Sequence, residues 1–132
     1  MRSLARKTSM RKLLIFAAVS EGSLGLILLV YPPIVIRLLF NYEISGAGVL
    51  VSRVAGISLI ALGVACWPDC NTLRAFFGML AYGLLVMLYL VYLGVNGGVG
   101  ILLWPAVAFH ACLSVLLVLA WRKEQQDKAK SA

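Results

Sequence analysis

Charged residues are scarce in this sequence. They make up 13% of its 132 residues, whereas hydrophobic residues make up 62% and the mean hydropathy is +0.97. A soluble domain typically carries about 25% charged and about 45–50% apolar residues. The deficit excludes a domain that folds in water, a disordered chain and a nucleic-acid-binding domain, even though the formal net charge is +7.

Residues that carry enzymatic or metal chemistry are also few. The sequence has one His, three Cys and five acidic residues. It contains no HExxH motif, no phosphate-binding glycine-rich loop and no Ser-His-Asp constellation. A single His cannot supply both axial ligands of a b-type haem. We therefore expect no catalytic residue, no metal and no cofactor, and the sequence favours a protein that is not an enzyme.

What the sequence has instead is four long apolar segments. A helix that crosses about 30 Å of hydrocarbon needs about 20 mostly apolar residues. The sequence predicts an all-α integral membrane four-helix bundle over residues 13–121, flanked by basic segments at residues 1–12 and 122–132. The four expected spans run over residues 13–31, 46–67, 73–95 and 99–121.

The basic residues predict how the chain is threaded. Nine of the twelve Lys and Arg residues lie in the two terminal segments. With both termini in the cytoplasm, Arg74 joins them inside and Arg37 alone lies in an outer loop, as the positive-inside rule requires. We expect a multi-pass protein of a bacterial-type inner membrane with cytoplasmic N and C termini. A cleaved signal peptide over residues 1–20 is the alternative, but the apolar run resumes after Glu21, which favours an uncleaved span.

The segment between the first two spans, residues 32–45, is too apolar for a solvated loop. Pro32 and Pro33 are suited to the first turn of a helix. We expect a short helix on the outer membrane surface, with Arg37 reaching water.

Small residues recur at helix spacing in the first two spans. Gly48, Ser52 and Gly56 are four residues apart, and Ala18, Gly22 and Gly25 share the first span. Such residues allow membrane helices to approach closely, either within one bundle or between protomers. The expected partners are membrane lipids together with a second copy of the chain or a larger membrane complex, and no nucleic acid.

Ionisable residues inside the spans are the sharpest functional signal, because burying a charge in hydrocarbon is costly. Glu21, Arg53 and His110 are the three. At 1.5 Å of rise per residue, Glu21 lies about 12 Å from its helix end, Tyr82 about 13 Å and His110 about 16 Å. We expect the side chains of Glu21, Tyr82 and His110 to lie in one layer near the midplane. Ser114 lies one turn from His110.

Two questions stay open at this point. Arg53 lies about 10 Å below the outer surface, and it either snorkels to the outer headgroups or takes an interior role. An ion pair with Glu21 is disfavoured, because helical side chains lean toward their own N-terminus, so that Arg53 leans outward and Glu21 inward. Glu21 is either a protonated acid bonded to Ser20, Ser23 or a neighbouring helix, or a partner of His110. Pro105 is expected to bend the fourth span.

A tyrosine stripe runs along one face of the third span. Its members are Gly78, Tyr82, Leu85, Tyr89 and Tyr92, at spacings of three and four. The phenols are suited to lining a slot for a flat hydrophobic ligand, although such residues more often pack against neighbouring helices. The candidate residues for ligand binding or proton exchange are Glu21, Arg53, Tyr82, Tyr89, His110 and Ser114.

Cys66 and Cys70 are separated by three residues, so their spacing differs from the C-x-x-C of redox motifs. In a reducing compartment these thiols and Cys112 are expected to be free.

Two stretches carry a resemblance to a known family. The first span ends at Tyr31-Pro32-Pro33, and the second reads Arg53-Val54-Ala55-Gly56-Ile57-Ser58-Leu59 and continues to Gly63. In this layout the chain resembles small bacterial four-helix inner-membrane proteins that are loosely DoxX-like. DoxX-like proteins often carry an acidic residue in the second span, where this chain has Arg53. This departure counts against a shared redox role, and no functional residue is carried over.

The function expected from these observations is non-enzymatic: a small membrane bundle that binds a lipid or another amphipath, or that assembles a complex. Two alternatives remain. One is an oligomeric, proton-coupled small-molecule transporter in which Glu21 titrates, and the other is a quinone-linked redox accessory subunit that uses the tyrosine stripe.

Overall fold

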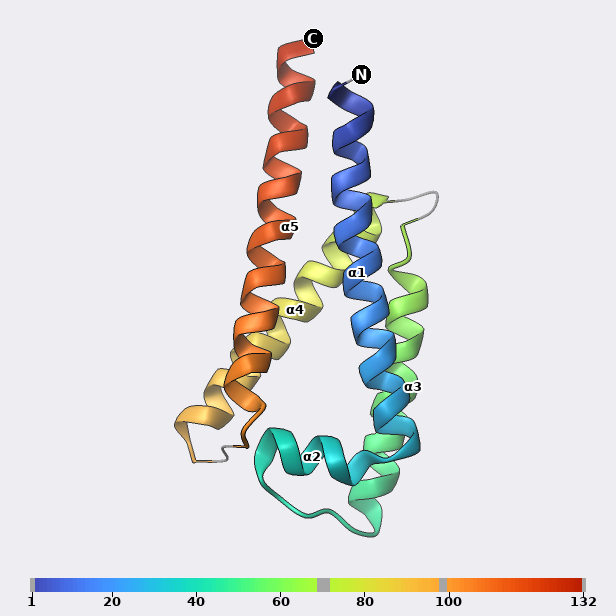
Figure 1. Ribbon diagram of the computed structural model, residues 1–132, viewed down its shortest axis with the longest axis vertical. Coiled ribbons are helices and arrows are strands. Elements are labelled where there is room, and N and C mark those ends of the chain that lie inside the picture. The colour runs from blue at the N-terminus through green and yellow to red at the C-terminus, as the bar shows by residue number, and fades with distance from the viewer. Residues whose placement is uncertain (1, 69–71, 98–99, 132) are drawn as a thin grey trace.

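The computed structural model describes residues 2–68, 72–97 and 100–131, and this part of the chain is helical throughout apart from short connections. The helices are α1 (Arg2–Val30), α2 (Pro32–Phe40), α3 (Ala47–Ala65), α4 (Thr72–Val95) and α5 (Leu103–Ser131). Figure 1 shows α2 lying across one end of the bundle that the longer helices form. The predicted all-α fold with a short helix between the first two spans is confirmed.

Four of the helices are long and apolar enough to cross a membrane. The spanning segments are Met10–Val30, Ala47–Ala65, Thr72–Val95 and Leu103–Lys130. This is the architecture of a multi-pass membrane protein. In a bilayer a helix satisfies its own backbone hydrogen bonds, which is why long apolar segments adopt this structure.

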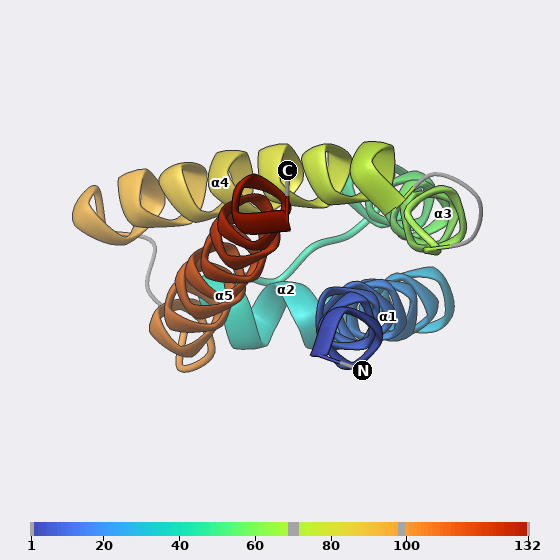
Figure 2. The ribbon, with the colours of Figure 1, turned by 90° about the horizontal axis from the view of Figure 1, so that it is seen from above.

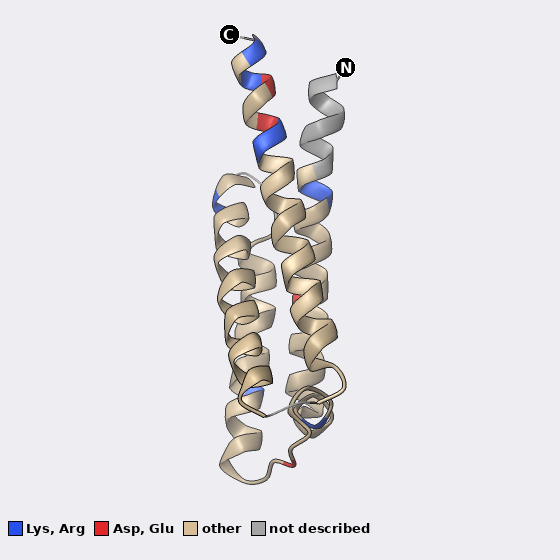
Figure 3. Ribbon diagram, turned by 90° about the vertical axis from the view of Figure 1, so that its left-hand side faces the viewer, with Lys and Arg blue, Asp and Glu red and all other residues tan. Residues whose placement is uncertain are grey.

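The basic terminal segments continue the first and last helices beyond their apolar parts. Both termini lie at the end of the bundle opposite α2, which we call the terminal end (Figure 1). Lys and Arg side chains are concentrated there, and the rest of the helices carry few charges (Figure 3). Lys128 Nζ lies 3.1 Å from Glu124 Oε1 one turn away on α5, a spacing that supports an exposed helix.

At the opposite end, which we call the α2 end, α2 begins with two prolines and ends at Asn41. The Asn41 backbone is left-handed, with φ at 52°, and its N–H donates to the carbonyl oxygen of Arg37 at 2.9 Å. Asn tolerates this conformation and is a common helix terminator. Pro32 and Val35 are buried against the bundle, while Arg37 is exposed as expected.

The last helix begins four residues later than the sequence suggested. Residues 100–102 are bonded to α2 instead, because the N–H groups of Gly100 and Leu102 donate to the carbonyl oxygens of Leu39 and Leu38, each at 2.9 Å. Pro105 therefore lies in the first turn of α5, where a missing N–H costs no intrahelical hydrogen bond. The prediction that Pro105 bends a longer helix is wrong for this reason.

The helices form two close pairs, α1 with α3 and α4 with α5, and α1 also contacts α4 and α5. Figure 2, seen from the terminal end, shows α1 beside α3 on one side and α5 crossing α4 on the other. At the terminal end the pairs meet in an apolar core that includes Leu14, Phe76 and Leu117. Phe76 also stacks on Trp121, with ring centroids 5.9 Å apart.

Glycines bring α1 and α3 into backbone contact. A Cβ atom on Gly56 would lie 2.6 Å from the carbonyl oxygen of Gly25, and one on Gly63 would lie 2.8 Å from that of Ala18. The predicted close packing therefore occurs within the chain at these residues. Gly48 does not take part, since a Cβ atom there would meet only Ile44, at 3.4 Å.

Replacing Gly56 with Ala should destabilise the protein, because the new methyl group meets backbone atoms that cannot rotate away. We expect the free energy of unfolding to fall by about 1–3 kcal/mol. Thermal unfolding in detergent, followed by circular dichroism, measures this change. Gly22→Ala is the matched control, because a Cβ atom there meets nothing within 4 Å; equal stability of the two variants would contradict the packing.

Candidate ligand site

Three helices bring polar side chains together in the middle of the bundle. Glu21 comes from α1, Tyr82 from α4 and His110 from α5. His110 Nδ1 lies 3.8 Å from Glu21 Oε1, and the Tyr82 hydroxyl faces the same carboxyl group. The rings of Tyr82 and His110 meet edge to face with centroids 6.1 Å apart. The layer expected from residue counting is therefore a contact cluster.

This cluster is shielded from the surface of the molecule. Glu21 is 3% exposed, and His110 and Ser114 are each 6% exposed. A small cavity of about 10 Å³ lies among Glu21, Tyr82, His110 and Ser114. That volume is close to the minimum of about 10–15 Å³ that holds one water molecule. Glu21 Oε2 is buried and has no hydrogen-bond partner within the described part of the chain.

The local sequence explains why Glu21 turns to the other helices. The hydroxyl of Ser20 donates to the carbonyl oxygen of Ala17, and that of Ser23 donates to Val19. Both serines thus bond to their own helix. The expected hydrogen bond from Ser20 or Ser23 to the Glu21 carboxyl group does not occur. On the opposite side, Gly83 lets α5 approach, because a Cβ atom there would lie 3.2 Å from Ser114 Oγ.

A much larger cavity occupies the half of the bundle nearer to α2. Its volume is about 570 Å³, within the range of about 300–1,000 Å³ that is usual for small-molecule sites. All five helices contribute to its wall, and α2 supplies six of the lining residues. The wall is aliphatic or aromatic except at Ser52, Tyr82 and His110.

The two cavities share a wall. Tyr82 and His110 line both of them, while Glu21 and Ser114 line only the small one. The large cavity therefore ends, on its side toward the middle of the bundle, at a phenol and an imidazole that are backed by a buried carboxyl group. This arrangement can hold an apolar molecule and form hydrogen bonds to one end of it.

The large cavity is also open on one side. Val51 and Ala55 of α3 line it and are exposed, and across from them it is lined by Val86 and Leu90 of α4. Toward α2, α3 and α4 diverge from the connection that joins them (Figure 1). The exposed lining residues include Ile27 of α1 as well as Val51 and Ala55 of α3, all on spanning helices, so the cavity is accessible from the side of the bundle.

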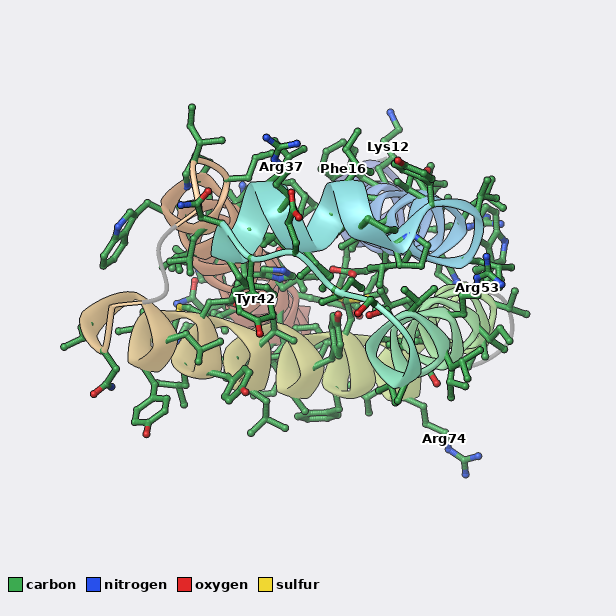
Figure 4. All side chains as sticks on the ribbon, turned by 90° about the horizontal axis from the view of Figure 1, so that it is seen from below. Lys12, Phe16, Arg37, Tyr42, Arg53 and Arg74 are labelled. Carbon is green, nitrogen blue, oxygen red and sulfur yellow. The ribbon has the colours of Figure 1, made fainter. Side chains whose placement is uncertain are left out.

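Two of the candidate residues do not join the site. Arg53 is exposed on α3 and is not among the residues that line either cavity. Figure 4, seen from the α2 end, shows it at the margin of the bundle. Its side chain does not pair with Glu21, whose neighbours come from α4 and α5. Tyr89 is 61% exposed, so the tyrosine stripe does not form a slot inside the bundle.

Sequence reasoning missed the cavity itself and the part that α2 plays in it. Leu38, Leu39 and Phe40 were recognised as too apolar for a loop, and this was the available signal. Their side chains line the large cavity. Ser52 was assigned to helix packing, but it faces the cavity while its hydroxyl donates to the Gly48 carbonyl oxygen at 2.9 Å.

The thiols lie away from both cavities. Cys66 is buried in the core at the terminal end, and Cys112 is exposed on α5. Both are free, and Cys70 lies outside the described residues. Within the described ranges, no group of three His, Cys, Asp or Glu residues is close enough to hold a metal ion.

Comparisons of the chain with protein-family models, curated proteins and solved structures gave no match.

Replacing Glu21 with Leu should destabilise the bundle, because His110 and Tyr82 lose the group that their polar atoms face. A buried polar group left without a partner costs about 1–3 kcal/mol. Glu21→Gln keeps an acceptor oxygen of the same reach and should cost less. Thermal unfolding in detergent measures both variants, with Ser23→Ala as an exposed control on the same helix.

The combination of Glu21→Leu with His110→Leu tests the coupling directly. If the two groups interact, the double variant loses less free energy of unfolding than the two single variants lose together. Strict additivity would mean that the contact contributes nothing to stability.

Proposed function

We propose that this protein binds a lipid or another amphipath in the cavity beneath α2. The observation that carries the proposal is the large apolar cavity that ends at a buried hydrogen-bonding cluster. An apolar wall with a few convergent polar groups is the usual composition of a small-molecule site. No catalytic step is needed to account for these residues.

The lateral opening supports a ligand that arrives from the bilayer. The described residues around it are mostly aliphatic, and α3 is exposed there at Val51 and Ala55. A molecule dissolved in hydrocarbon can enter between α3 and α4 without crossing water. A water-soluble ligand would have to lose its hydration before reaching the same opening.

We also propose the membrane and the orientation. Nine of the twelve basic residues belong to the terminal segments, and Arg37 lies at the α2 end. In a bacterial-type inner membrane the positive-inside rule then sets both termini in the cytoplasm and α2 at the outer surface. The cavity would open to the outer leaflet.

Assembly with a second copy or a larger complex remains a proposal. Many large apolar side chains are exposed, which suits contact with either lipid or another membrane helix. Gly25, Gly56 and Gly63 are used between α1 and α3, so they lend no support to a contact between protomers.

Proton-coupled transport and a quinone-linked redox role stay as alternatives. A transporter would need Glu21 to be reached from both membrane faces. Toward the terminal end, the neighbours of the small cavity are core residues such as Met79, Leu113 and Leu117. Tyr89, which a slot for a quinone would use, is exposed. Neither observation favours these alternatives over binding.

Filling the cavity should remove the ligand. Ala106 lines it and is half-buried, so the indole of Ala106→Trp would occupy that volume. We expect bound lipid to fall about tenfold, the equivalent of ~1.4 kcal/mol of lost contacts. Native mass spectrometry of protein extracted from vesicles of phosphatidylethanolamine and phosphatidylglycerol that also contain dodecanol measures how much of each compound stays bound.

Ala108→Trp is the matched control, because Ala108 is exposed on the same helix and does not line the cavity. Equal lipid occupancy in the two variants would refute binding at this site.

The orientation can be tested by thiol labelling in a background without cysteine. Glu43 follows α2 and Lys123 is near the end of α5, and both side chains are exposed. A membrane-impermeant maleimide added to intact spheroplasts should label Glu43→Cys. It should label Lys123→Cys only after the membrane is opened, and the reverse pattern would overturn the proposed orientation.

A further inference from the structure

The large cavity has hydrogen-bonding groups but no charged ones in its wall. Among the described residues that line it, none is Lys, Arg, Asp or Glu. Arg37 and Glu43 line a separate hollow of about 380 Å³ at the α2 end instead. Arg53 is exposed on α3 and is not part of the wall.

The wall therefore offers a charged ligand head no Lys, Arg, Asp or Glu as a counterion. In a low-dielectric site an unpaired charge is expensive to bury, whether it is a phosphate, a carboxylate or an ammonium group. An anionic head would also face Glu21, whose carboxyl group lies directly behind His110. An uncharged head avoids both costs.

Apart from Ser52, whose hydroxyl donates to the Gly48 carbonyl oxygen of its own helix, the polar residues of the wall lie at one end of the cavity. Tyr82 and His110 are near the middle of the bundle, whereas the side chains from α2 close the opposite end. Along α4, Tyr82 and Leu90 both line the cavity, and a rise of 1.5 Å per residue separates them by about 12 Å. A ligand that matches this polarity has its head in the middle of the bundle and its chain toward α2.

We infer that the ligand is a hydrocarbon-chain compound with an uncharged hydroxyl or carbonyl head, bound with that head innermost against Tyr82 and His110. The inference rests on the proposed binding function and adds the ligand's class and direction to it. A phospholipid that keeps its head at the surface would set the end of an acyl chain against these two polar side chains, which offers them no hydrogen-bond partner beyond Glu21.

Two photoreactive dodecanol probes test the direction. One carries a diazirine next to the hydroxyl group, and the other carries it near the end of the chain. In protein reconstituted in nanodiscs, the first should label α4 and α5 around Tyr82 and His110, and the second should label α2 around Leu39. Peptide mass spectrometry locates the labelled residues.

Competition tests the charge. An excess of plain dodecanol should reduce labelling about tenfold more effectively than equal amounts of dodecyl phosphate or dodecyltrimethylammonium, since the charged heads must be desolvated without a counterion. Equal competition by all three compounds would overturn the inference.

A pair of tyrosine variants tests the hydrogen bond. Tyr82→Phe removes the hydroxyl group at the head position and should weaken labelling by the probes about three- to tenfold, the value of one hydrogen bond. Tyr89→Phe removes an exposed hydroxyl group from the same helix and should have no effect. Unchanged labelling in Tyr82→Phe would contradict the assignment of the head.

The outcomes separate this inference from the proposed function. Labels within the cavity but in the reverse order would overturn the head-innermost direction and leave binding intact. Labels that fall only outside the cavity-lining residues would overturn binding itself. The labelling map and the competition use the unmodified chain, so neither depends on how a variant folds.

Discussion

The close contact between α1 and α3 determines the shape of this bundle. Gly25 and Gly56 allow the two backbones to touch, so α1 is held against α3 and away from the part of α4 nearer to α2. The second pair, α4 and α5, shares the terminal-end core with the first. Toward α2 the pairs separate, and the cavity occupies the space between them. Helix α2 lies across this end and supplies much of the cavity wall.

The polar cluster lies where the two pairs part. Glu21 belongs to the first pair, whereas Tyr82 and His110 belong to the second, so their contacts join the pairs at the inner end of the cavity. Hydrocarbon offers no hydrogen bonds, and polar side chains at this depth are satisfied by one another or by a ligand. Binding and architecture therefore depend on the same residues: the cluster joins the pairs and also forms the polar end of the cavity.

Much of the fold could be predicted because membrane helices follow simple rules of length and hydropathy. The four spans and the helix after Pro32 and Pro33 follow from these rules. The start of the last helix could not be predicted from these rules. Residues 100–102 form hydrogen bonds with the end of α2, which is about 60 residues away in the sequence. Half of the candidate site could be found by counting residues from the helix ends, because depth in a membrane is proportional to residue number.

The sequence by itself determined that the chain is helical and built to cross a bilayer, and that Glu21, Tyr82 and His110 share one depth. Only the tertiary structure decided which of the polar side chains face one another. Tyr82 and Tyr89 are two turns apart on the same face of α4, yet Tyr82 meets His110 and Tyr89 is 61% exposed. Arg53 is similarly exposed on α3, while the Glu21 carboxyl group faces His110. The physical reason is that helical periodicity determines which face of its helix a residue lies on. The angle at which two helices cross determines which residues on that face are covered by the neighbouring helix.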